Sequence, residues 1–173
     1  CAVHADLWDR WGERLFSALD EHEGISVSVF SGGESDLSGW LDSGLVDTAL
    51  GYVPITRVGV VNEAVGEDQL ILVSTDPDAP LRFDPGYIFV DYGEDFSQQH
   101  MTFYADANSA RLTFNAPSPA LSFILNKGGT AYLPARMVEA LVAQGRLHRL
   151  AQAPVFTRAV FLNRKEDAAI DAR

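Results

Sequence analysis

The sequence predicts an α/β protein made of two lobes that are joined by two crossover strands. Strands and helices alternate twice along the chain, first over residues 1–50 and again over residues 87–144. A segment rich in Pro and Asp, 75–80, separates the two series and is typical of a linker. Apolar strands at 70–74 and 155–162 lie where the chain leaves the first lobe and returns to it. Alternation of this kind favours parallel sheets with right-handed crossovers.

Length and composition agree with a globular protein. The chain has 173 residues, of which 47% are hydrophobic and 21% charged, and these values exclude a disordered or collagen-like chain. No apolar run approaches the ~18 residues of a transmembrane helix, so we expect no membrane partner. Cys1 is the single cysteine and cannot form an intrachain disulfide. The net charge of −11 argues against DNA binding by this chain alone, because phosphate contacts need a surplus of Lys and Arg.

The first lobe is predicted to alternate helices and strands from its beginning. Apolar residues at spacings of three and four predict an amphipathic helix over 7–22, with Asp6 as its N-cap. Alternation of apolar residues with Ser predicts a strand over 25–30, and a Ser-Gly-Gly turn leads into a helix over 34–42. A buried strand is predicted at 46–50.

Two more strands are predicted before the linker. Apolar runs at 58–61 and 70–74 indicate strands, and the polar residues 62–69 between them indicate a connection. The second run leaves the lobe, and the last apolar strand of the chain returns to it. Lobe I is therefore expected to comprise residues 1–74 together with 154–173.

The second lobe, 75–153, is predicted to repeat the alternation. Its elements are strands at 87–91, 111–114, 131–133 and 147–150, and helices at about 95–104, 119–127 and 135–143. Ser118 and Pro119 suit the N-cap and the first position of the middle helix. The charged, Ala-rich tail 163–173 is predicted to be a short helix or frayed.

The sequence carries no signal of catalysis. Its four histidines stand far apart, at positions 4, 22, 100 and 148, and lack the spacing of a metal-binding motif. It contains no Gly-x-Ser-x-Gly elbow and no Gly-x-x-x-x-Gly-Lys loop for phosphate. We therefore predict no catalytic residue, no metal site and no cofactor, and expect that the protein is not an enzyme.

Several stretches resemble one family, in the same order. Residues 41–50, Leu-Asp-Ser-Gly-Leu-Val-Asp-Thr-Ala-Leu, fit the pattern L-x-x-G-x-x-D-x-A-[IL] of LysR-type transcriptional regulators. Residues 70–73 resemble the crossover strand of that family, and 118–134 resemble its segment with a Ser, paired glycines and a final Leu-Pro. Gly-Arg-Leu at 145–147 and Ala-Pro-Val at 153–155 fall at its G-x-L and return strand. Over nearly its whole length, the chain resembles the effector-binding (substrate-binding) domain of these regulators.

This resemblance implies a type 2 periplasmic-binding-protein-like fold, with two Rossmann-like lobes and a ligand cleft between the lobes. In the family, a winged helix-turn-helix that binds DNA and a linker helix precede this domain, and neither is part of this chain. We expect the chain, which begins at Cys1 without a signal-peptide pattern, to be an internal fragment whose first strand is shortened to Cys1–Val3. DNA and RNA polymerase are then partners only of the full-length protein, in the cytoplasm.

The function implied by the resemblance is effector sensing and oligomerisation for transcription regulation. A small metabolite would bind in the cleft between the lobes and modulate DNA binding. Few Arg or Lys residues map to the predicted cleft, so we expect a mono- or dicarboxylate held by helix N-termini rather than a polyanion. The alternative is a free-standing solute-binding protein of a transporter, which shares the two-lobe plan. An enzyme with a similar fold is a third alternative, without support from motifs.

The predicted effector site lies in loops beyond the carboxyl ends of the strands of both lobes. Its residues are expected to be His4, Ala5, Asp6, Ser31, Gly32, Asp91, Tyr92 and Ser118. Asp6 and Ser118 are also suited to capping helices, and Gly32 to a tight turn. His4 could equally be a solvated loop residue, and Tyr92 a packing residue.

The charge distribution suggests how copies of the chain associate. Residues 1–80 carry 15 acidic and 3 basic side chains, whereas residues 131–173 carry 4 and 7. In the family, the first helix of lobe I packs antiparallel on a lobe II helix of a second copy, here 7–22 on 135–144. The resemblance implies a homodimer or homotetramer, with its interface at Trp11, Glu13, Arg136, Met137 and Leu141 and with Val138 facing outward. An isologous pair brings the opposite charges together twice.

Overall fold

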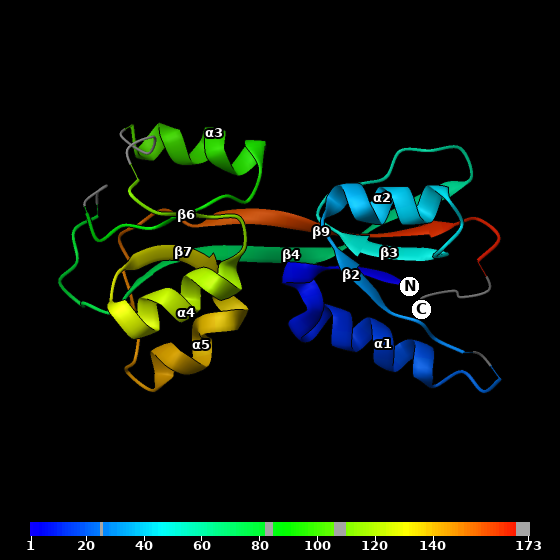
Figure 1. The fold of residues 1–173 in the computed structure, drawn as a ribbon, viewed down its shortest axis with the longest axis horizontal. Helices are drawn as coiled ribbons and strands as arrows, with labels where there is room; N and C mark the ends of the chain where they lie inside the picture. Colours follow the sequence, from blue (N-terminus) through cyan, green and yellow to red (C-terminus); the bar gives the residue numbers. More distant parts are fainter. Residues whose placement is uncertain (25, 82–84, 106–109, 169–173) are drawn as a thin grey trace. The chain divides into compact units, whose positions relative to one another are not determined.

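The chain divides into two compact units, which are described separately (Figure 1). The computed structural model describes four stretches of the chain: 1–24, 26–81, 85–105 and 110–168. Unit 1 comprises Cys1–Glu67 and Arg158–Arg173, and unit 2 comprises Asp68–Thr157. Each boundary between the units lies within a long strand. The first falls in β4 (Val60–Ser74) and the second in β9 (Phe156–Lys165).

Unit 1 contains a parallel sheet with β1 at its centre. Strand β1 (Ala2–His4) pairs in parallel with β2 (Phe30–Gly32) on one side and with β3 (Thr48–Gly51) on the other. Strand β9 extends this sheet as the antiparallel neighbour of β3. The shortened first strand, with only three residues, therefore still pairs with a neighbouring strand on each side. The strand predicted over 25–30 begins only at its last residue, since 26–29 adopt no regular structure and residue 25 lies outside the described residues.

Helices cover both faces of this sheet. Successive residues of a strand point to opposite faces, and Ala2 and Val3 of β1 accordingly belong to different clusters of buried side chains. Ala2 packs with Leu37 and Leu41 of α2 (Glu34–Asp42). Val3 packs with apolar residues at and after the chain's first turn, which are Leu7, Trp11 and Leu15.

The first helix is shorter and less regular than predicted. In place of one helix over 7–22, the structure has a 3-10 turn (Ala5–Leu7), a π-type turn (Trp8–Gly12) and α1 (Glu13–Asp20). Arg10 adopts a φ of 69°, which is not helical. Gly12 lies so close to Val3 that a Cβ atom there would approach it to 3.1 Å. The apolar periodicity indicated the buried face only in part, since Leu7 and Leu19 are buried but Trp8 and Phe16 are exposed. It also carries no information about a kink in the backbone.

Strand β4 is one continuous strand of 15 residues, so the prediction of two strands separated by a connection at 62–69 is wrong. The residues from Asn62 to Val65 are exposed, whereas those from Leu70 to Ser74 are buried. Because a strand pairs through its backbone, β4 continues beside β9 through residues whose side chains face solvent. Hydrophobicity therefore reported the burial of this segment rather than its conformation.

Unit 2 is built on the second half of β4. That half pairs with β7 (Thr130–Pro134) and β8 (His148–Arg149), both antiparallel. A separate parallel pair is formed by β5 (Phe89–Val90) and β6 (Thr113–Phe114). Tyr87, just before β5, bridges to Thr130 of β7.

Among the described residues of unit 2, three helices pack on the strands, and Figure 1 shows α3 across the strands from α4 and α5. Helix α3 (Glu94–Phe103) contributes to a cluster rich in aromatic side chains. Helices α4 (Pro117–Lys127) and α5 (Ala135–Ala143) contribute to a second, mainly aliphatic cluster. Leu70 and Leu72 of β4 belong to the first cluster, Ile71 and Val73 to the second, as the alternation of a strand requires.

Local signals fixed some boundaries and misplaced others. The helices predicted at 34–42 and 135–143 have these bounds in the structure. Helix α4 begins earlier than predicted, with Ala116 in the N-cap position and Pro117 as its first residue. At the C-terminus, β9 extends to Lys165, and residues 166–168 form a turn, so neither a helix nor frayed chain begins at 163. The rest of the predicted tail lies outside the described residues.

Candidate functional site

The three parallel strands of unit 1 end at one edge of the sheet. His4 lies opposite Gly32, and Val3 lies opposite Leu50, so the carboxyl ends of β1, β2 and β3 are at the same level. In parallel α/β sheets this edge is the usual place for a ligand, because the loops that leave it converge and helix N-termini point toward it. The side chains gathered here form the candidate site of unit 1.

His4, the last residue of β1, holds the turn that follows it. Its Nδ1 accepts a hydrogen bond from the backbone N–H of Asp6 at 3.2 Å, so His4 caps the 3-10 turn. The prediction that Asp6 is the N-cap is therefore wrong. Because Nδ1 is the acceptor, the neutral ring carries its proton on Nε2, which is a donor. Burial, helped by the charge of Arg158, lowers the pKa of His4 to about 4. At neutral pH, His4 therefore offers an uncharged N–H.

Tyr52, directly after β3, links the other members of the site. The guanidinium carbon of Arg158 lies 3.7 Å from the centre of the Tyr52 ring, and its Nη2 donates a hydrogen bond of 2.7 Å to the Tyr52 hydroxyl. The ring of His4 contacts the same tyrosine edge-on, with 5.1 Å between ring centres. The backbone N–H of Tyr52 donates to Oε1 of Glu34 at 2.6 Å. Tyr52 thus connects β1 and β9 through its side chain and α2 through its backbone N–H.

Glu34 is the first residue of α2, and its carboxylate binds backbone rather than facing solvent. Burial raises the pKa of Glu34, although backbone hydrogen bonds from Tyr52 and Val53 and the charge of Arg158 act in the opposite direction. Gly51 makes this approach possible, because a Cβ atom there would lie 2.9 Å from Oε2 of Glu34. The carboxylate therefore fixes the loop after β3 to the start of α2.

The arrangement suits binding of an anion more than bond-making chemistry. The guanidinium of Arg158 is planar, which matches the geometry of a carboxylate, and its Nη2 also donates to Tyr52. The Nε2–H of His4 is a second donor nearby, and neither group is a nucleophile. Within the described stretches, no group of three or more His, Cys, Asp and Glu side chains could hold a metal ion.

The other predicted residues of unit 1 lie at the same edge with smaller roles. Ala5 is exposed in the 3-10 turn, and Ser31 is exposed on β2. Gly32 permits the close approach of α2, since a Cβ atom there would lie 2.8 Å from both Oδ2 of Asp36 and Cη2 of Trp40. The backbone N–H of Gly33 donates to Asp36 at 2.9 Å, and this contact begins the helix.

In unit 2, the predicted residues lie at the carboxyl edge of the β5–β6 pair. Asp91 follows β5, and its Oδ1 accepts a hydrogen bond from the backbone N–H of Gly93 at 2.9 Å. Tyr92 packs edge-on against Phe96 and donates its hydroxyl proton to the carbonyl of Tyr132 at 2.9 Å. Both contacts are structural, and they favour the packing alternative for Tyr92.

Ser118 does not have the capping role that the sequence suggested. It is the second residue of α4, its side chain is exposed, and no side chain caps this helix. Two prolines flank it, and Pro117 rather than Pro119 takes the first helical position. Ser118 therefore lies at a helix start near Asp91 in the topology, with its hydroxyl available to solvent.

The predicted interface residues differ in their exposure. Glu13 is exposed at the start of α1, and Met137 and Leu141 are partly buried against the core of unit 2. Trp11 packs on Gly66 of β4. Val138, expected to face outward, is fully buried in the core, so that expectation is wrong.

Arg136 has a partner within its own unit. Its Nε and Nη2 donate to the two carboxylate oxygens of Asp68 at 3.1 and 3.3 Å, and the two side chains are only 4% and 3% exposed. This buried ion pair joins α5 to β4 within unit 2, so the guanidinium of Arg136 is not available to a second chain. The complementary cations for a partner's acidic helix then have to come from elsewhere on the chain.

Sequence analysis missed Arg158, Tyr52 and Glu34. Two of them carried a usable signal, since Tyr52 lies two residues after a predicted strand and Glu34 directly follows a glycine turn. Arg158 is the only charged residue of the apolar stretch 155–162, which is unusual for a buried strand. Its meeting with Tyr52, 106 positions earlier, depends on the pairing of β9 with β3.

Comparisons with known proteins place the fold. Residues 10–173 match the family model described as the LysR substrate binding domain. No curated protein sequence matches the chain. Along the described part of the chain, none of the helices is both long and apolar enough to cross a membrane.

Several solved structures share the fold at low sequence identity. The apo regulatory domain of HypT from Salmonella typhimurium matches with a TM-score of 0.74 and 16% identity, over 99% of this chain and 87% of that chain. A variant of the OxyR2 regulatory domain from Vibrio vulnificus matches with a TM-score of 0.73 and 12% identity, over 97% and 86%. Full-length LysG from Corynebacterium glutamicum matches with a TM-score of 0.70 and 14% identity, over 99% of this chain and 61% of LysG.

Proposed function

This chain belongs to the family of LysR substrate-binding domains, and from that membership we propose that it senses a small carboxylate for a transcriptional regulator. The family is one of regulatory domains and not of enzymes. The chain covers 61% of full-length LysG, so DNA binding, target genes and contacts with RNA polymerase belong to the whole regulator. A regulator of this kind works in the compartment that holds the DNA.

The observation that supports a carboxylate is the placement of Arg158 at the carboxyl edge of unit 1. Its guanidinium stacks on Tyr52 and lies near the neutral His4, which supplies a second N–H donor. A planar cation held by stacking loses little conformational freedom when it binds, and it can form two parallel hydrogen bonds with a carboxylate. Asp6 and Glu34 nearby disfavour a ligand with several negative charges.

The proposed signal is a shift between conformations of the two units. A ligand favours the conformation in which its affinity is higher, and only that difference in affinity moves the equilibrium. In unit 2, the exposed start of α4 at Ser118 and the loop at Asp91 are the proposed contacts. In a regulator, such a change would alter the spacing of DNA-binding domains in an oligomer.

A solute-binding protein of a transporter is the alternative with the same architecture. The family match disfavours it, because the model that matches residues 10–173 describes a domain of LysR regulators. An enzyme is disfavoured by the same match.

The test is a thermal-shift screen of mono- and dicarboxylates, followed by calorimetric titration of the best ligand. A compound that binds only the folded chain raises its melting temperature by mass action. For that ligand, Arg158→Gln should weaken binding about tenfold or more, equivalent to ~1.4 kcal/mol. Arg164→Gln, which removes the same charge from the same strand β9, should change the dissociation constant less than about twofold.

Two results would contradict the proposal. One is a screen in which uncharged metabolites stabilise the chain and carboxylates do not. The other is equal loss of affinity in Arg158→Gln and Arg164→Gln, which would show that Arg158 affects binding only through the net charge of the chain. Circular dichroism of both variants separates loss of the site from loss of the fold.

A further inference from the structure

Unit 2 has a cavity at the end of its parallel strands opposite to the proposed effector contacts. Its volume is about 370 Å³, within the range of roughly 300–1,000 Å³ that is usual for small-molecule sites. Its lining comes from the residues before β5 and β6, from the C-terminal part of α4 and from the two glycines after that helix, namely Pro85, Gly86, Tyr87, Ile88, Arg111, Leu112, Phe123, Lys127, Gly128 and Gly129.

This cavity is separate from the loops at Asp91 and Ser118. Those loops follow the carboxyl ends of β5 and β6, whereas Ile88 and Leu112 precede the same two strands. Helix α4 spans the distance between the two places, and its 11 residues correspond to about 16 Å of helix. A ligand in the cavity therefore does not touch the proposed effector residues.

The walls of the cavity are held by backbone hydrogen bonds. The N–H of Ile88 donates to the carbonyl of Thr130 at 2.8 Å, and the N–H of Thr130 donates to the carbonyl of Gly86 at 2.9 Å. Thr75 holds Gly129 through its hydroxyl at 3.0 Å and through its backbone N–H at 3.1 Å. These contacts preform the site, so binding does not have to order this backbone.

Apolar side chains form the body of the cavity. Phe123 is half-buried and packs against Phe114 of β6, with 6.0 Å between the ring centres. Ile88 and Leu112 add aliphatic surface. A flat apolar group fits such walls, because the ring of Phe123 can contact it in an offset or edge-on arrangement.

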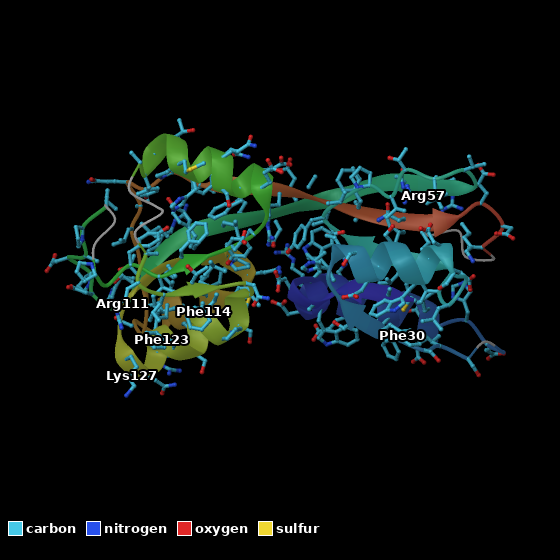
Figure 2. All side chains as sticks on the ribbon, turned by 45° about the horizontal axis from the view of Figure 1, so that its top comes forward. Phe30, Arg57, Arg111, Phe114, Phe123 and Lys127 are labelled. Atoms are coloured by element: carbon cyan, nitrogen blue, oxygen red, sulfur yellow. The ribbon has the colours of Figure 1, made fainter. Side chains whose placement is uncertain are left out.

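Two cations lie at this apolar body, and Figure 2 shows both of them with Phe123 at the same end of unit 2. Lys127 lies one turn after Phe123 on α4, so the two share a helix face. Neither Arg111 nor Lys127 makes an ion pair or a side-chain hydrogen bond within the part of the chain that the structure describes. Among the described residues that line the cavity none is acidic, although the chain carries 24 acidic and 13 basic side chains.

The position of the cavity explains why both cations matter. The carbonyl end of a helix carries partial negative charge, which repels an anion near the end of α4. One cation offsets that charge and the second supplies the net attraction. Arg111 can form a planar pair with a carboxylate, whereas the Lys127 ammonium acts as a point charge.

We propose that this cavity of unit 2 is a second ligand site that binds a small aromatic carboxylate. The ring occupies the space between Phe123, Ile88 and Leu112, and the carboxylate pairs with Arg111 and Lys127. The site stands on unit 2 alone and goes beyond the effector binding proposed above, so either can fail without the other.

The test is calorimetric titration of the 173-residue chain with 2-naphthoate, with its uncharged amide and inorganic phosphate as comparison ligands. We expect the carboxylate to bind with a dissociation constant below about 1 mM and both comparison ligands at least tenfold more weakly. The double variant Arg111→Gln/Lys127→Gln should weaken 2-naphthoate binding by about tenfold or more. Leu112→Trp, which fills the cavity without changing charge, should also abolish binding.

Matched control variants distinguish binding in this cavity from a general effect of charge. Arg146→Gln/Arg149→Gln removes two exposed charges from the same unit and should leave the dissociation constant within about twofold. Equal binding of the amide, equal binding of phosphate, or equal loss in the two double variants would each overturn the proposal.

Discussion

Arg136 and Asp68 make the clearest case of a single pair that supports the fold. Both side chains are removed from water, and two hydrogen bonds join them. Removing one partner from such a pair leaves a buried charge without compensation, which costs more than the pair contributes. Asp68 is in β4 and Arg136 is in α5, so the pair fixes this helix to the strand.

Asp68→Leu is therefore expected to lower the free energy of unfolding by about 3 kcal/mol or more. The double variant Asp68→Leu/Arg136→Met, with an apolar pair of similar size, should recover most of that loss. Urea titrations of the single and double variants measure the coupling. Additive effects of the two substitutions would show that the residues do not stabilise each other.

His100 lies in the aromatic cluster of unit 2 and is fully buried. Its Nε2 is 2.6 Å from the hydroxyl of Tyr87, its ring stacks on Tyr104, and Phe96, Tyr132 and Phe156 surround it. Burial lowers the pKa of His100 to about 4. The unfolded chain, with a pKa of about 6.5, then binds more protons than the folded chain between these values.

Stability should consequently fall as the pH decreases from about 6.5 toward 4. His100 accounts for up to about 1.4 kcal/mol per pH unit in that window, and the stability it contributes is fully present above it. In His100→Gln, the amide can replace Nε2 opposite Tyr87, and the unfolding free energy should depend less on pH. Identical slopes in the parent and His100→Gln would contradict the assignment.

At the scale of elements, β4 depends on a glycine where Trp11 crosses it. A Cβ atom at Gly66 would overlap the outer ring of Trp11 and lie 3.1 Å from its Cζ2. The indole thereby packs the kinked entry to α1 directly on the backbone of the strand. Side chains cannot be enlarged at such a contact without displacing one of the two elements.

Gly66→Ala should destabilise the chain by about 1–3 kcal/mol. Trp11→Leu should reduce this cost when it is combined with Gly66→Ala, because the smaller side chain leaves room for the methyl group. Gly39→Ala, in the middle of α2 with open space around it, should instead stabilise by about 0.5–1 kcal/mol. The measurement is the melting temperature of Gly66→Ala, Trp11→Leu, the double variant and Gly39→Ala. Additive effects of Gly66→Ala and Trp11→Leu would contradict a direct contact between the two residues.

At the scale of the whole molecule, we propose a homodimer in which α1 of one chain packs on α5 of another. Glu13, Asp20 and Glu21 are exposed on or next to α1, and Arg146 and Arg149 are exposed after α5. Trp8 and Phe16, 40% and 36% exposed, form an aromatic pair beside the acidic residues. Arg136 is not suited to test this contact, because its substitution would damage the fold before it reached an interface.

The dimer should weaken with added salt, since exposed charge pairs are screened over about 8–10 Å at ordinary ionic strength. Arg146→Glu should weaken it further, by about tenfold in dissociation constant, and Glu13→Arg added to that variant should restore part of the loss. Sedimentation equilibrium at two salt concentrations measures all three. A chain that remains monomeric at tens of micromolar, or a dimer insensitive to these charges, would contradict the arrangement.

The sequence by itself determined the class of the protein. Alternating strands and helices, two series of them, predicted the α/β fold, and the ordered motifs predicted the family that the comparison of residues 10–173 confirmed. The bounds of α2 and α5 also followed from local signals, because glycine, proline and apolar periodicity act within a few residues.

The tertiary structure alone decided which side chains meet. Arg158 reaches Tyr52 across 106 positions, and Arg136 reaches Asp68 across 68. It also decided that β4 is continuous, because backbone pairing with β9 does not require apolar side chains. Periodicity indicates which face of a helix or strand is buried, whereas the contact partners of a side chain depend on strand register and helix packing between distant segments. The site and the buried ion pair therefore could not be predicted from spacing.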